Sequence, residues 1–572
     1  EHLRTRMLVD SLFAAAERIR VEEKAPTRAL PVYEVLCQAH GGRTPMTATA
    51  LVLCGTIRMD ELNDLDRANA LFDMALQIEP RNARALNNKG LAAMRVYKLV
   101  SAGELFNKAI EVDPTSPSAY NNLGLCYQMI GDIPAALDAY ERCLVACGYM
   151  EKAATNKLLC LNYSTEHSRD ECSDAHFAYA RQKRDALAAS TYATHPNTKD
   201  PARRIRIGYL SADYCDHPVA YFFEAVLAHR DREGTHVTLY YGGKQQDAVT
   251  AQFKSLADDF QNVDLLNAEE VAARIHSDGI DILVELSGYT TLAPVAIPAA
   301  VMHPAPIQVS WIGYPNTTGL DAIHYRFTDA IADPPASTQR YAETLVRLPH
   351  CFLCYTPPAH MPQLADAPPC VSNGYITFGS FNNISKVNKD VVAAWAQVLN
   401  AVPGSRFLMK SRLFVDEEGR DRWIGLFAEH GVGSERLEMR SVTKTPAEHL
   451  SLYNEMDIAL DSFPYSGTTT TFESLMMGVP VVSLAQAPPH GSHSHNVSAS
   501  VLTQVGREAW VAWTREEYTS IAAALASDTS MIAEQRKTLR AALLASPSCQ
   551  GEEFMQAVDS EYRGMWTRYC AS

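Results

Sequence analysis

The chain has 572 residues, enough for about two to four domains of ordinary size. Hydrophobic residues make up 47% of it, charged residues 20% and aromatic residues 9%, which excludes a wholly disordered, collagen-like or coiled-coil protein. The 51 basic and 66 acidic residues give a net charge of −15, which argues against nucleic acid or an anionic membrane surface as the main partner.

The charge is distributed unevenly along the chain. Residues 1–200 contain 23 basic and 25 acidic side chains, whereas residues 201–572 contain 28 and 41. Thirteen cysteines, an odd number without dense spacing, indicate reduced thiols and a cytoplasmic location. No apolar run approaches the roughly 18–20 residues of a membrane span, and charged residues interrupt the first apolar ones, so neither a membrane protein nor a signal peptide is predicted.

A 34-residue period dominates the first third of the chain. Several sets of residues recur at this spacing: Ala68, Ala102 and Ala136; Phe72, Phe106 and Tyr140; and Asn88, Asn122 and Asn156. Small residues at helix contacts, with an aromatic ring to fill the gap between helices, are typical of tetratricopeptide repeats, each a pair of antiparallel helices. The period predicts such repeats over residues 47–190, and residues 1–46 are expected to form a helical cap or a degenerate repeat.

The repeated asparagines would form a ladder along the concave surface of the stacked repeats. Amide side chains can donate to and accept from the backbone of an extended peptide whatever its sequence. The alternative is that Asn88, Asn122 and Asn156 only satisfy helix ends or neighbouring turns. We favour the peptide-binding groove.

After a helical stretch near residues 171–188 and a polar linker, short apolar runs alternate with helical stretches. This alternation predicts two α/β lobes with parallel sheets, residues 203–365 and residues 370–572, the second closing with helices from about residue 515. The expected strands of the first lobe are Ile205–Leu210, Val237–Tyr241, Ile282–Leu286, Ile307–Trp311 and Tyr325–Thr328. Those of the second lobe are Tyr375–Phe381, Arg406–Lys410, Leu437–Arg440, Ile458–Asp461 and Val479–Leu484.

Open α/β sheets bind ligands beyond the carboxyl ends of their strands, so the loops that follow strands are candidates for chemistry. Asp213 and His217 follow the first strand, and a histidine there can act as a general base. Lys386 follows the first strand of the second lobe and precedes a helix expected near Asn388, a position that suits a phosphate. A capping histidine and a solvated lysine are the alternatives.

The most informative stretch is DIALDSFPYSGTTTTFESLMMGVPVVSL, residues 457–484. A buried strand is followed by a loop and then by Thr468–Thr471 at the start of a helix. Threonine hydroxyls and free N–H groups at a helix start bind anions. Glu473, about one turn into the helix, could accept hydrogen bonds from two ribose hydroxyls. Because four successive threonines are poor helix formers, an N-cap alone does not explain them.

Two other patterns carry less weight. His490, His493 and His495 lack an acidic or cysteine partner that would complete a metal site, so a flexible loop is expected there. Cys351 and Cys354 form a single CxxC without a second pair, and we interpret it as chance. Neither a P-loop nor a G-x-G-x-x-G motif occurs.

Together, these features resemble the protein O-linked N-acetylglucosamine transferases, in a bacterial-type form. The matching segments include GYLSADYCDHPVAYF, HPAPIQVSWIGYPNTTGLDAIHY, FGSFNNISKVNKD and DSFPYSGTTTTFESLMMGVPVV. The resemblance implies a tetratricopeptide superhelix followed by a GT-B glycosyltransferase of two Rossmann-like lobes. It implies inverting transfer of N-acetylglucosamine from UDP-GlcNAc to Ser or Thr hydroxyls, with no metal ion or other cofactor. It also implies acceptor proteins bound through the repeat groove; homo-oligomerisation is left open.

The resemblance also implies roles for single residues. His217 and Lys386 match the catalytic positions, the proposed base and the lysine on the donor diphosphate. The donor-binding positions are Asn383, Lys386, Thr443, Lys444, His449, Thr468, Thr469, Thr470 and Glu473. Among these, the threonines would cradle the diphosphate, Glu473 would bind ribose and His449 would lie against uracil. The acceptor groove would contain Asn88, Asn122 and Asn156.

Two alternatives to this function remain. The chain could be a non-catalytic tetratricopeptide scaffold whose α/β region only binds a nucleotide sugar. It could also be a glycosyltransferase that uses another sugar or another acceptor, since Thr468 and Glu473 stand where animal relatives have His and Asp. The pairing of Lys386 with the threonine run favours an enzyme.

Overall fold

The structure, a computed structural model, describes residues 2–39, 44–146, 148, 150–290, 292–359 and 361–572. It divides into two compact units. The first contains residues 1–153 together with residues 412–422, and the second contains residues 154–411 together with residues 423–572.

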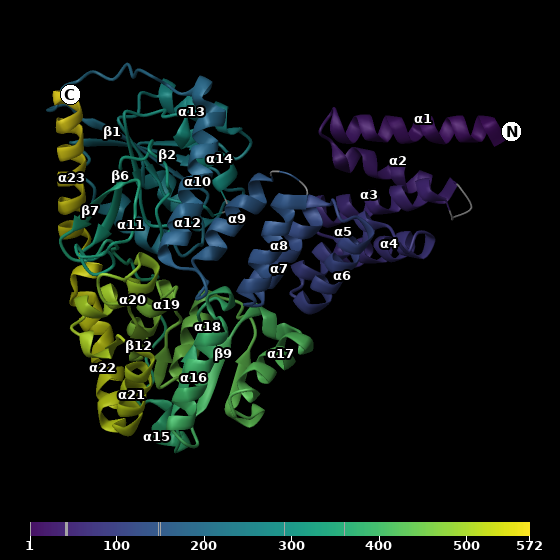
Figure 1. The fold of residues 1–572 in the computed structure, drawn as a ribbon. Coiled ribbons are helices and arrows are strands. Elements are labelled where there is room, and N and C mark those ends of the chain that lie inside the picture. The colour runs from purple at the N-terminus through teal and green to yellow at the C-terminus, as the bar shows by residue number, and fades with distance from the viewer. Residues whose placement is uncertain (1, 40–43, 147, 149, 291, 360) are drawn as a thin grey trace. The chain divides into compact units, whose positions relative to one another are not determined.

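Among the described residues up to Ser190, helices are the only regular secondary structure (Figure 1). They are α1 (His2–Val21), α2 (Pro26–Ala39), α3 (Pro45–Glu61), α4 (Leu65–Ile78), α5 (Ala83–Arg95), α6 (Leu99–Val112), α7 (Pro117–Met129), α8 (Ile133–Ala146), α9 (Glu151–Leu161) and α10 (Arg169–Leu187). Successive helices α3–α4, α5–α6 and α7–α8 pack as pairs, and each pair packs on the next. The predicted helical repeats are therefore confirmed.

An aromatic ring fills the space beside a glycine in three of these pairs. A Cβ atom at Gly90 in α5 would lie 2.6 Å from Cε1 of Phe106 in α6. Gly55 and Gly124 meet Phe72 and Tyr140 in the same way, at 2.5 Å each. All three rings are fully buried. The period therefore reflects a packing rule: a glycine on one helix leaves space for an aromatic ring of the next helix.

The first lobe contains a parallel seven-stranded sheet in the order β3-β2-β1-β4-β5-β6-β7. Its elements are β1 (Ile205–Ser211), α11 (Ala220–His229), β2 (Thr235–Tyr241), α12 (Ala248–Leu256), β3 (Asp259–Asn262), α13 (Ala268–Ser277), β4 (Ile282–Glu285), α14 (Ala293–Val301), β5 (Ile307–Ser310), β6 (Tyr325–Asp329) and β7 (Thr344–Leu348). The most apolar run of the chain forms α14, a buried helix. Among the described residues, no helix is both long and apolar enough to cross a membrane.

The second lobe contains a parallel six-stranded sheet in the order β10-β9-β8-β11-β12-β13. Its elements are α15 (Pro369–Asn373), β8 (Thr377–Ser380), α16 (Lys389–Ala401), β9 (Arg406–Lys410), α17 (Glu417–Ala428), β10 (Leu437–Arg440), α18 (Pro446–Ser451), β11 (Ile458–Leu460), α19 (Thr469–Met476), β12 (Val481–Leu484), α20 (His493–Gln504), β13 (Val511–Ala512), α21 (Arg515–Ser527), α22 (Thr529–Ala545) and α23 (Gly551–Ala571).

The last helix, α23, returns to the first lobe, where it packs against α11, β5 and β7 (Figure 1). The hydroxyls of Tyr562 in α23 and Tyr209 in β1 lie 3.1 Å apart in the core. Arg563 donates to the carbonyl oxygens of Arg203 and Gly234, at 2.7 and 3.1 Å. The C-terminal segment therefore ties the two lobes together.

All ten expected strands are present, and with the repeats they confirm the predicted fold class. The sequence missed β3, β7 and β13. β3 and β7 lie at the two edges of the first sheet, where few residues are buried, and β13 has only two residues. Edge strands lack the continuous apolar run that marks a buried parallel strand.

Replacing Gly90 with Ala should lower the free energy of unfolding by up to about 2 kcal/mol. Overpacking against Phe106 costs about 1–3 kcal/mol, more than the roughly 1 kcal/mol that alanine gains in helix propensity. Gly103→Ala in α6 is the matched control, because its Cβ would meet only the Cys126 sulfur, at 3.8 Å. Urea unfolding followed by circular dichroism measures both variants. Equal stabilities for the two would contradict the packing rule.

Candidate active site

The strand order of the second sheet reverses between β8 and β11, which are hydrogen-bonded neighbours. From β8 the chain continues to β9 on one side, and from β11 it continues to β12 on the other. The loops that leave these two strands therefore diverge, and such a switch point is where open α/β sheets bind ligands. Lys386 follows β8, and the threonine run follows β11.

Lys386 lies at this switch point. Its Nζ donates a hydrogen bond to the carbonyl oxygen of Gly467, in the loop after β11, and lies 4.1 Å from the centre of the Tyr465 ring. Burial lowers the pKa of Lys386 to about 8, and the nearby Asp461 carboxylate acts in the opposite direction. The lysine is therefore a cation held against neutral groups, and the Asp461 carboxylate supports its charge.

The loop between β11 and α19 is held by the buried Asp461. Its Oδ1 accepts hydrogen bonds from the N–H groups of Ser462 and Gly467, at 2.9 and 3.0 Å, and from Asn382 Nδ2, at 3.1 Å. Its Oδ2 accepts a bond from Ser483 Oγ at 2.9 Å. One carboxylate thus joins the loops after β8 and β11 to strand β12 and fixes where α19 begins.

Helix α19 starts with threonines whose hydroxyls make few caps. Thr468 is the N-cap residue, and its side chain caps no N–H group of the helix. Thr470 Oγ1 donates to Asn382 Oδ1 at 2.8 Å, whereas Thr471 pairs with Ser498 at 2.9 Å. Thr468, Thr469 and Thr470 are partly exposed. The first turn therefore presents N–H groups and the positive end of the helix dipole beside Lys386, an arrangement that attracts an anion.

Glu473 and His449 are joined directly. His449 Nε2 lies 3.1 Å from Glu473 Oε2, which also accepts a hydrogen bond from the Tyr453 hydroxyl at 2.9 Å. On its other side, His449 Nδ1 lies 2.5 Å from Lys410 Nζ, which also donates to Thr443 Oγ1 at 3.1 Å. Since the ammonium group can only donate, the neutral His449 ring carries its proton on Nε2 and donates it to Glu473.

Lys410 is a residue of this cluster that the sequence analysis did not single out. It is the last residue of β9, so it lies at the carboxyl end of the sheet, as do the loops after β8 and β11. A lysine ending an expected strand was the available signal. It carried no weight alone, because only the fold brings it against His449.

His217 lies in the first lobe, after β1, where the strand order reverses between β1 and β4. Its Nδ1 accepts a hydrogen bond from the Val219 N–H at 3.3 Å and lies 3.8 Å from Asp213 Oδ1. Its side chain is 42% exposed. No hydrogen bond or ion pair found among the described residues joins His217 to Lys386 or His449 of the second lobe.

Two acids flank this second switch point. Burial raises the pKa of Asp213 above its usual range, and it raises that of Glu285 at the end of β4 to about 7. Glu285 accepts hydrogen bonds from the N–H groups of Ser287 and Gly288, both at 2.7 Å. Glu285 is therefore the anchor of its loop, comparable to Asp461 in the other lobe.

Aromatic rings join the two lobes between these switch points. Phe472 in α19 packs on Phe222 of α11, with ring centres 5.3 Å apart, and stacks on Tyr355 at 4.9 Å. His217 lies three positions before α11. This contact holds the loop of His217 near the lobe that contains the threonine run.

Other expected site residues lie apart from these contacts. Asn383 is exposed and caps its own short turn by accepting the Ser385 N–H at 3.1 Å. Lys444 is exposed, and its N–H donates to Glu448 at 2.8 Å.

The asparagines of the repeats bond to one another. Asn88 Nδ2 donates to Thr56 at 2.8 Å, Asn87 donates to Asn88 Oδ1 at 3.1 Å, and Asn122 Nδ2 donates to Asn87 Oδ1 at 3.0 Å. The amides thus form a chain between neighbouring repeats. Asn88, Asn122 and Asn156 remain partly exposed, and their role in a peptide-binding groove stays a prediction.

The expectation of a flexible loop at the three histidines is wrong from His493 onward. α20 begins there, and both His493 and His495 are buried. His493 Nδ1 lies 2.6 Å from Asp333 Oδ2 in the first lobe. Among the described residues, no group of three or more His, Cys, Asp or Glu side chains could hold a metal ion, and every described cysteine is a free thiol.

Replacing Asp461 with Ala should lower the free energy of unfolding by at least about 3 kcal/mol. The change leaves several buried donors without an acceptor, at about 1–3 kcal/mol each. Urea denaturation measures the loss. Asp461→Asn, which keeps one acceptor oxygen, should lose clearly less. Equal losses in the two variants would show that the carboxylate does not organise the loop.

Comparison with known proteins identifies the family. The profile of glycosyl transferase family 41 matches residues 158–366 and 369–558, and a tetratricopeptide repeat profile matches residues 105–138. A mutant of the O-GlcNAc transferase of Thermobaculum terrenum has the same fold, with a TM-score of 0.83 and 32% sequence identity. The match covers 92% of this chain and 98% of that one.

Curated relatives include plant proteins. The barley (Hordeum vulgare) SPINDLY protein, named a probable UDP-N-acetylglucosamine–peptide N-acetylglucosaminyltransferase, is 43% identical over 422 residues, 73% of this chain and 44% of that protein. The SEC protein of Arabidopsis thaliana, which carries the same enzyme name, is 29% identical over 380 residues, 64% of this chain and 38% of that protein. The chain thus spans less than half the length of these relatives. From its matched residues and its fold, the chain belongs to glycosyl transferase family 41.

Proposed function

We propose that this protein transfers N-acetylglucosamine from UDP-GlcNAc to Ser or Thr hydroxyls of proteins, with inversion and without a metal ion. The observation that carries the proposal is the hydrogen bond from Lys386 to Gly467, the residue before the N-cap of α19, at the switch point of the second sheet. The names of the SPINDLY and SEC proteins and of the Thermobaculum terrenum structure support the same donor and reaction.

In this proposal, the donor diphosphate lies between Lys386 and Thr468–Thr470. The lysine supplies one positive charge, and the N–H groups and hydroxyls at the helix start supply oriented dipoles. Preorganised groups of this kind stabilise the negative charge that develops on a leaving phosphate, which is the largest single contribution in many enzymes. Asn383, Thr443 and Lys444 complete the expected donor set, and Thr443 accepts a hydrogen bond from Lys410.

The nucleoside would lie along the cluster beside α19. Glu473 uses Oε2 for both His449 and Tyr453, and no bond to its Oε1 is found among the described residues, so this oxygen could accept a ribose hydroxyl. The His449 ring is fixed on both sides, by Lys410 and by Glu473, and offers a face for uracil.

The reaction itself is a displacement at the anomeric carbon. The acceptor oxygen forms a bond to this carbon as the bond to the UDP oxygen breaks on the opposite face, and the hydroxyl proton must leave. His217 either takes that proton or orients the acceptor, with a donor phosphate oxygen as the base. The Val219 N–H bond to Nδ1 places the proton of a neutral ring on Nε2, which favours the orienting role.

The acceptor protein would be guided by the tetratricopeptide repeats. Asn88, Asn122 and Asn156 would present amide edges to an extended acceptor segment, in addition to bonding within the repeats. Amide side chains bind a peptide backbone without regard to its sequence. The repeats would therefore hold many different acceptors.

Transfer of labelled N-acetylglucosamine from UDP-GlcNAc to proteins of a lysate, read by mass spectrometry, tests the proposal. Lys386→Ala should abolish transfer and leave the fold intact, because the leaving diphosphate loses its nearest cation. Lys389→Ala, an exposed lysine three positions later, is the matched control. Full activity of Lys386→Ala would contradict the assignment of Lys386 to the donor diphosphate.

Calorimetry separates the alternatives. Absence of binding for both UDP and UDP-GlcNAc would favour the non-catalytic scaffold. Binding of UDP but not of UDP-GlcNAc would favour another donor sugar. Donor binding with transfer to small molecules rather than proteins would favour another acceptor.

The affinity for UDP should fall as pH rises through about 8. Burial lowers the pKa of the lysine to about 8 in the free protein, and the diphosphate is expected to bind only the protonated form. Above this pH the lysine must therefore take up a proton when UDP binds, and this protonation weakens the observed affinity. Between about pH 7 and pH 9, the dissociation constant should rise about tenfold, with net proton uptake near pH 8. Calorimetry in buffers of different ionisation enthalpy measures both effects. Lys386→Met should show neither; a pH dependence that persists in this variant would contradict the assignment.

A further inference from the structure

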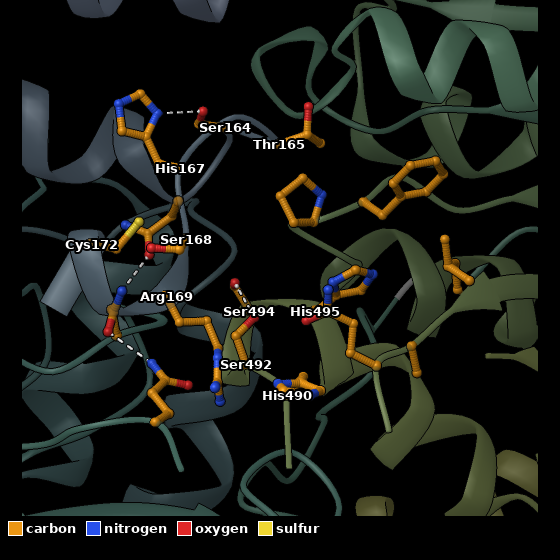
Figure 2. A pocket seen from close by; sticks show the side chains of 18 of the residues that line it. Ser164, Thr165, His167, Ser168, Arg169, Cys172, His490, Ser492, Ser494 and His495 are labelled. Carbon is orange, nitrogen blue, oxygen red and sulfur yellow. Dashed lines mark hydrogen bonds between the residues drawn. The ribbon is translucent and has the colours of Figure 1, made fainter. Parts of the chain in front are cut away.

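A cavity of about 580 Å³ lies within the second unit and contains none of the expected donor residues (Figure 2). It opens at the carboxyl ends of β11, β12 and β13, and its walls come from the α9–α10 loop, from the loop after β11 and from the start of α20. This volume is within the range of about 300–1,000 Å³ of small-molecule sites. The cavity is therefore large enough for a ligand of its own.

His495 lines this cavity and has no partner. The residue is 5% exposed, and neither ring nitrogen has a hydrogen-bond partner among the described residues. The ring lies parallel to that of Phe463, with 6° between the planes and 6.3 Å between the centres. Burial lowers the pKa of His495 to about 4, so the ring is neutral at pH 7 and has one N–H to donate and one lone pair to accept. A hydroxyl group that reached the ring would bond to either nitrogen.

The cavity also favours an anion. Arg169 donates to the carbonyl oxygens of Pro489 and Gly491, at 3.0 and 3.4 Å, and to Thr338 Oγ1 at 3.0 Å. All three partners are neutral, so none of them compensates its charge. The one acidic side chain in the lining, Asp170, already lies 3.5 Å from Arg340.

The start of α20 adds to this positive potential. Its N-cap Ser492 makes no side-chain cap, and the hydroxyls of Ser492 and Ser494 lie 3.4 Å apart in the lining (Figure 2). The helix has 12 residues, and its N-terminus carries the positive end of the helix dipole. Arg169, His495 and the first turn of α20 thus surround the same space.

One part of the cavity wall is apolar and partly open. Trp513 lines the cavity and is 50% exposed, although large aromatic side chains are normally covered. Its indole ring offers a flat apolar face at the cavity wall, and sugar rings present flat apolar faces of their own.

We propose that this cavity is a second small-molecule site, which binds a phosphorylated sugar or a similar hydroxyl-bearing oxyanion. The phosphate would lie between Arg169 and the first turn of α20, and the sugar hydroxyls would bond to His495. The site touches the loop of the donor cluster: Ser466 donates through its N–H and its hydroxyl to the Ser494 carbonyl oxygen, at 2.9 and 3.1 Å. The inference does not rest on the proposed function, because no expected donor residue lines the cavity.

Glucose 6-phosphate, titrated into protein saturated with UDP, is the probe. UDP first occupies the expected diphosphate site, so further binding reports the second one; titration without UDP keeps the test valid if UDP does not bind. Glucose 6-phosphate should bind at least about tenfold more tightly than glucose or inorganic phosphate, since only it combines both groups. Absence of binding, or equal binding of phosphate alone, would overturn the proposal.

Three variants locate the site. His495→Phe keeps the ring stacked on Phe463 but removes both nitrogens, and Arg169→Met removes the charge; each should weaken binding at least about tenfold. Arg507→Met is the matched control, because Arg507 also donates to neutral carbonyl oxygens, those of Val505 and Gly506, outside the cavity. Unchanged binding in the first two variants, or an equal loss in the control, would contradict the assignment.

Two further measurements sharpen the result. Because the His495 nitrogens are unpartnered, His495→Phe should unfold at the same urea concentration as the parent or a higher one in the absence of ligand. A marked loss of stability would show that the nitrogens have a structural partner and would overturn the argument. Displacement of glucose 6-phosphate by a glutamate-rich peptide that binds more tightly would assign the cavity to acceptor polypeptides instead.

Discussion

Lys386 donates a hydrogen bond to the carbonyl oxygen of Gly467, a residue 81 positions later in the chain, and the candidate active site depends on this contact. The two residues meet because β8 and β11 are neighbours in a parallel sheet, although β9 and β10 lie between them in sequence. Parallel strands need long crossover connections, and reversal of the strand order at this point makes the following loops diverge. Asp461 then fixes the start of α19 against the loop after β8.

The position of Lys386 beside the start of α19 matters because the surrounding chain is acidic. Residues 201–572 contain 28 basic and 41 acidic side chains, so a diphosphate would approach a surface of the wrong sign. Local geometry must compensate for the net charge. In the proposed site, one lysine and one helix start would compensate for it, because interactions with charges and dipoles strengthen where water is excluded. The same surroundings that strengthen the attraction also lower the pKa of the lysine.

The loop between β11 and α19 has two faces. On one side, Gly467 accepts a hydrogen bond from Lys386, and Thr468 follows as the N-cap of α19. On the other, Phe463 and Ser466 meet His495 and Ser494, at the wall of the second cavity. A ligand in that cavity would press on the segment that presents the threonines. The buried hydrogen bonds of Asp461 hold the loop between these two faces.

The sequence alone determined the repeats and the central strands, and it located the loops for which we propose the chemistry. Period, continuous apolar runs and the glycine–threonine helix start are local signals, so residues such as Phe106, Lys386 and Thr468 could be identified without a structure. The edge strands β3 and β7 lack such a signal, because few of their residues are buried and they have no continuous apolar run. Only the tertiary structure placed Lys410 against His449, made Asp461 the centre of its loop and buried His495. Each of these depends on which strands and loops become neighbours in space, which strand order decides and local sequence does not encode.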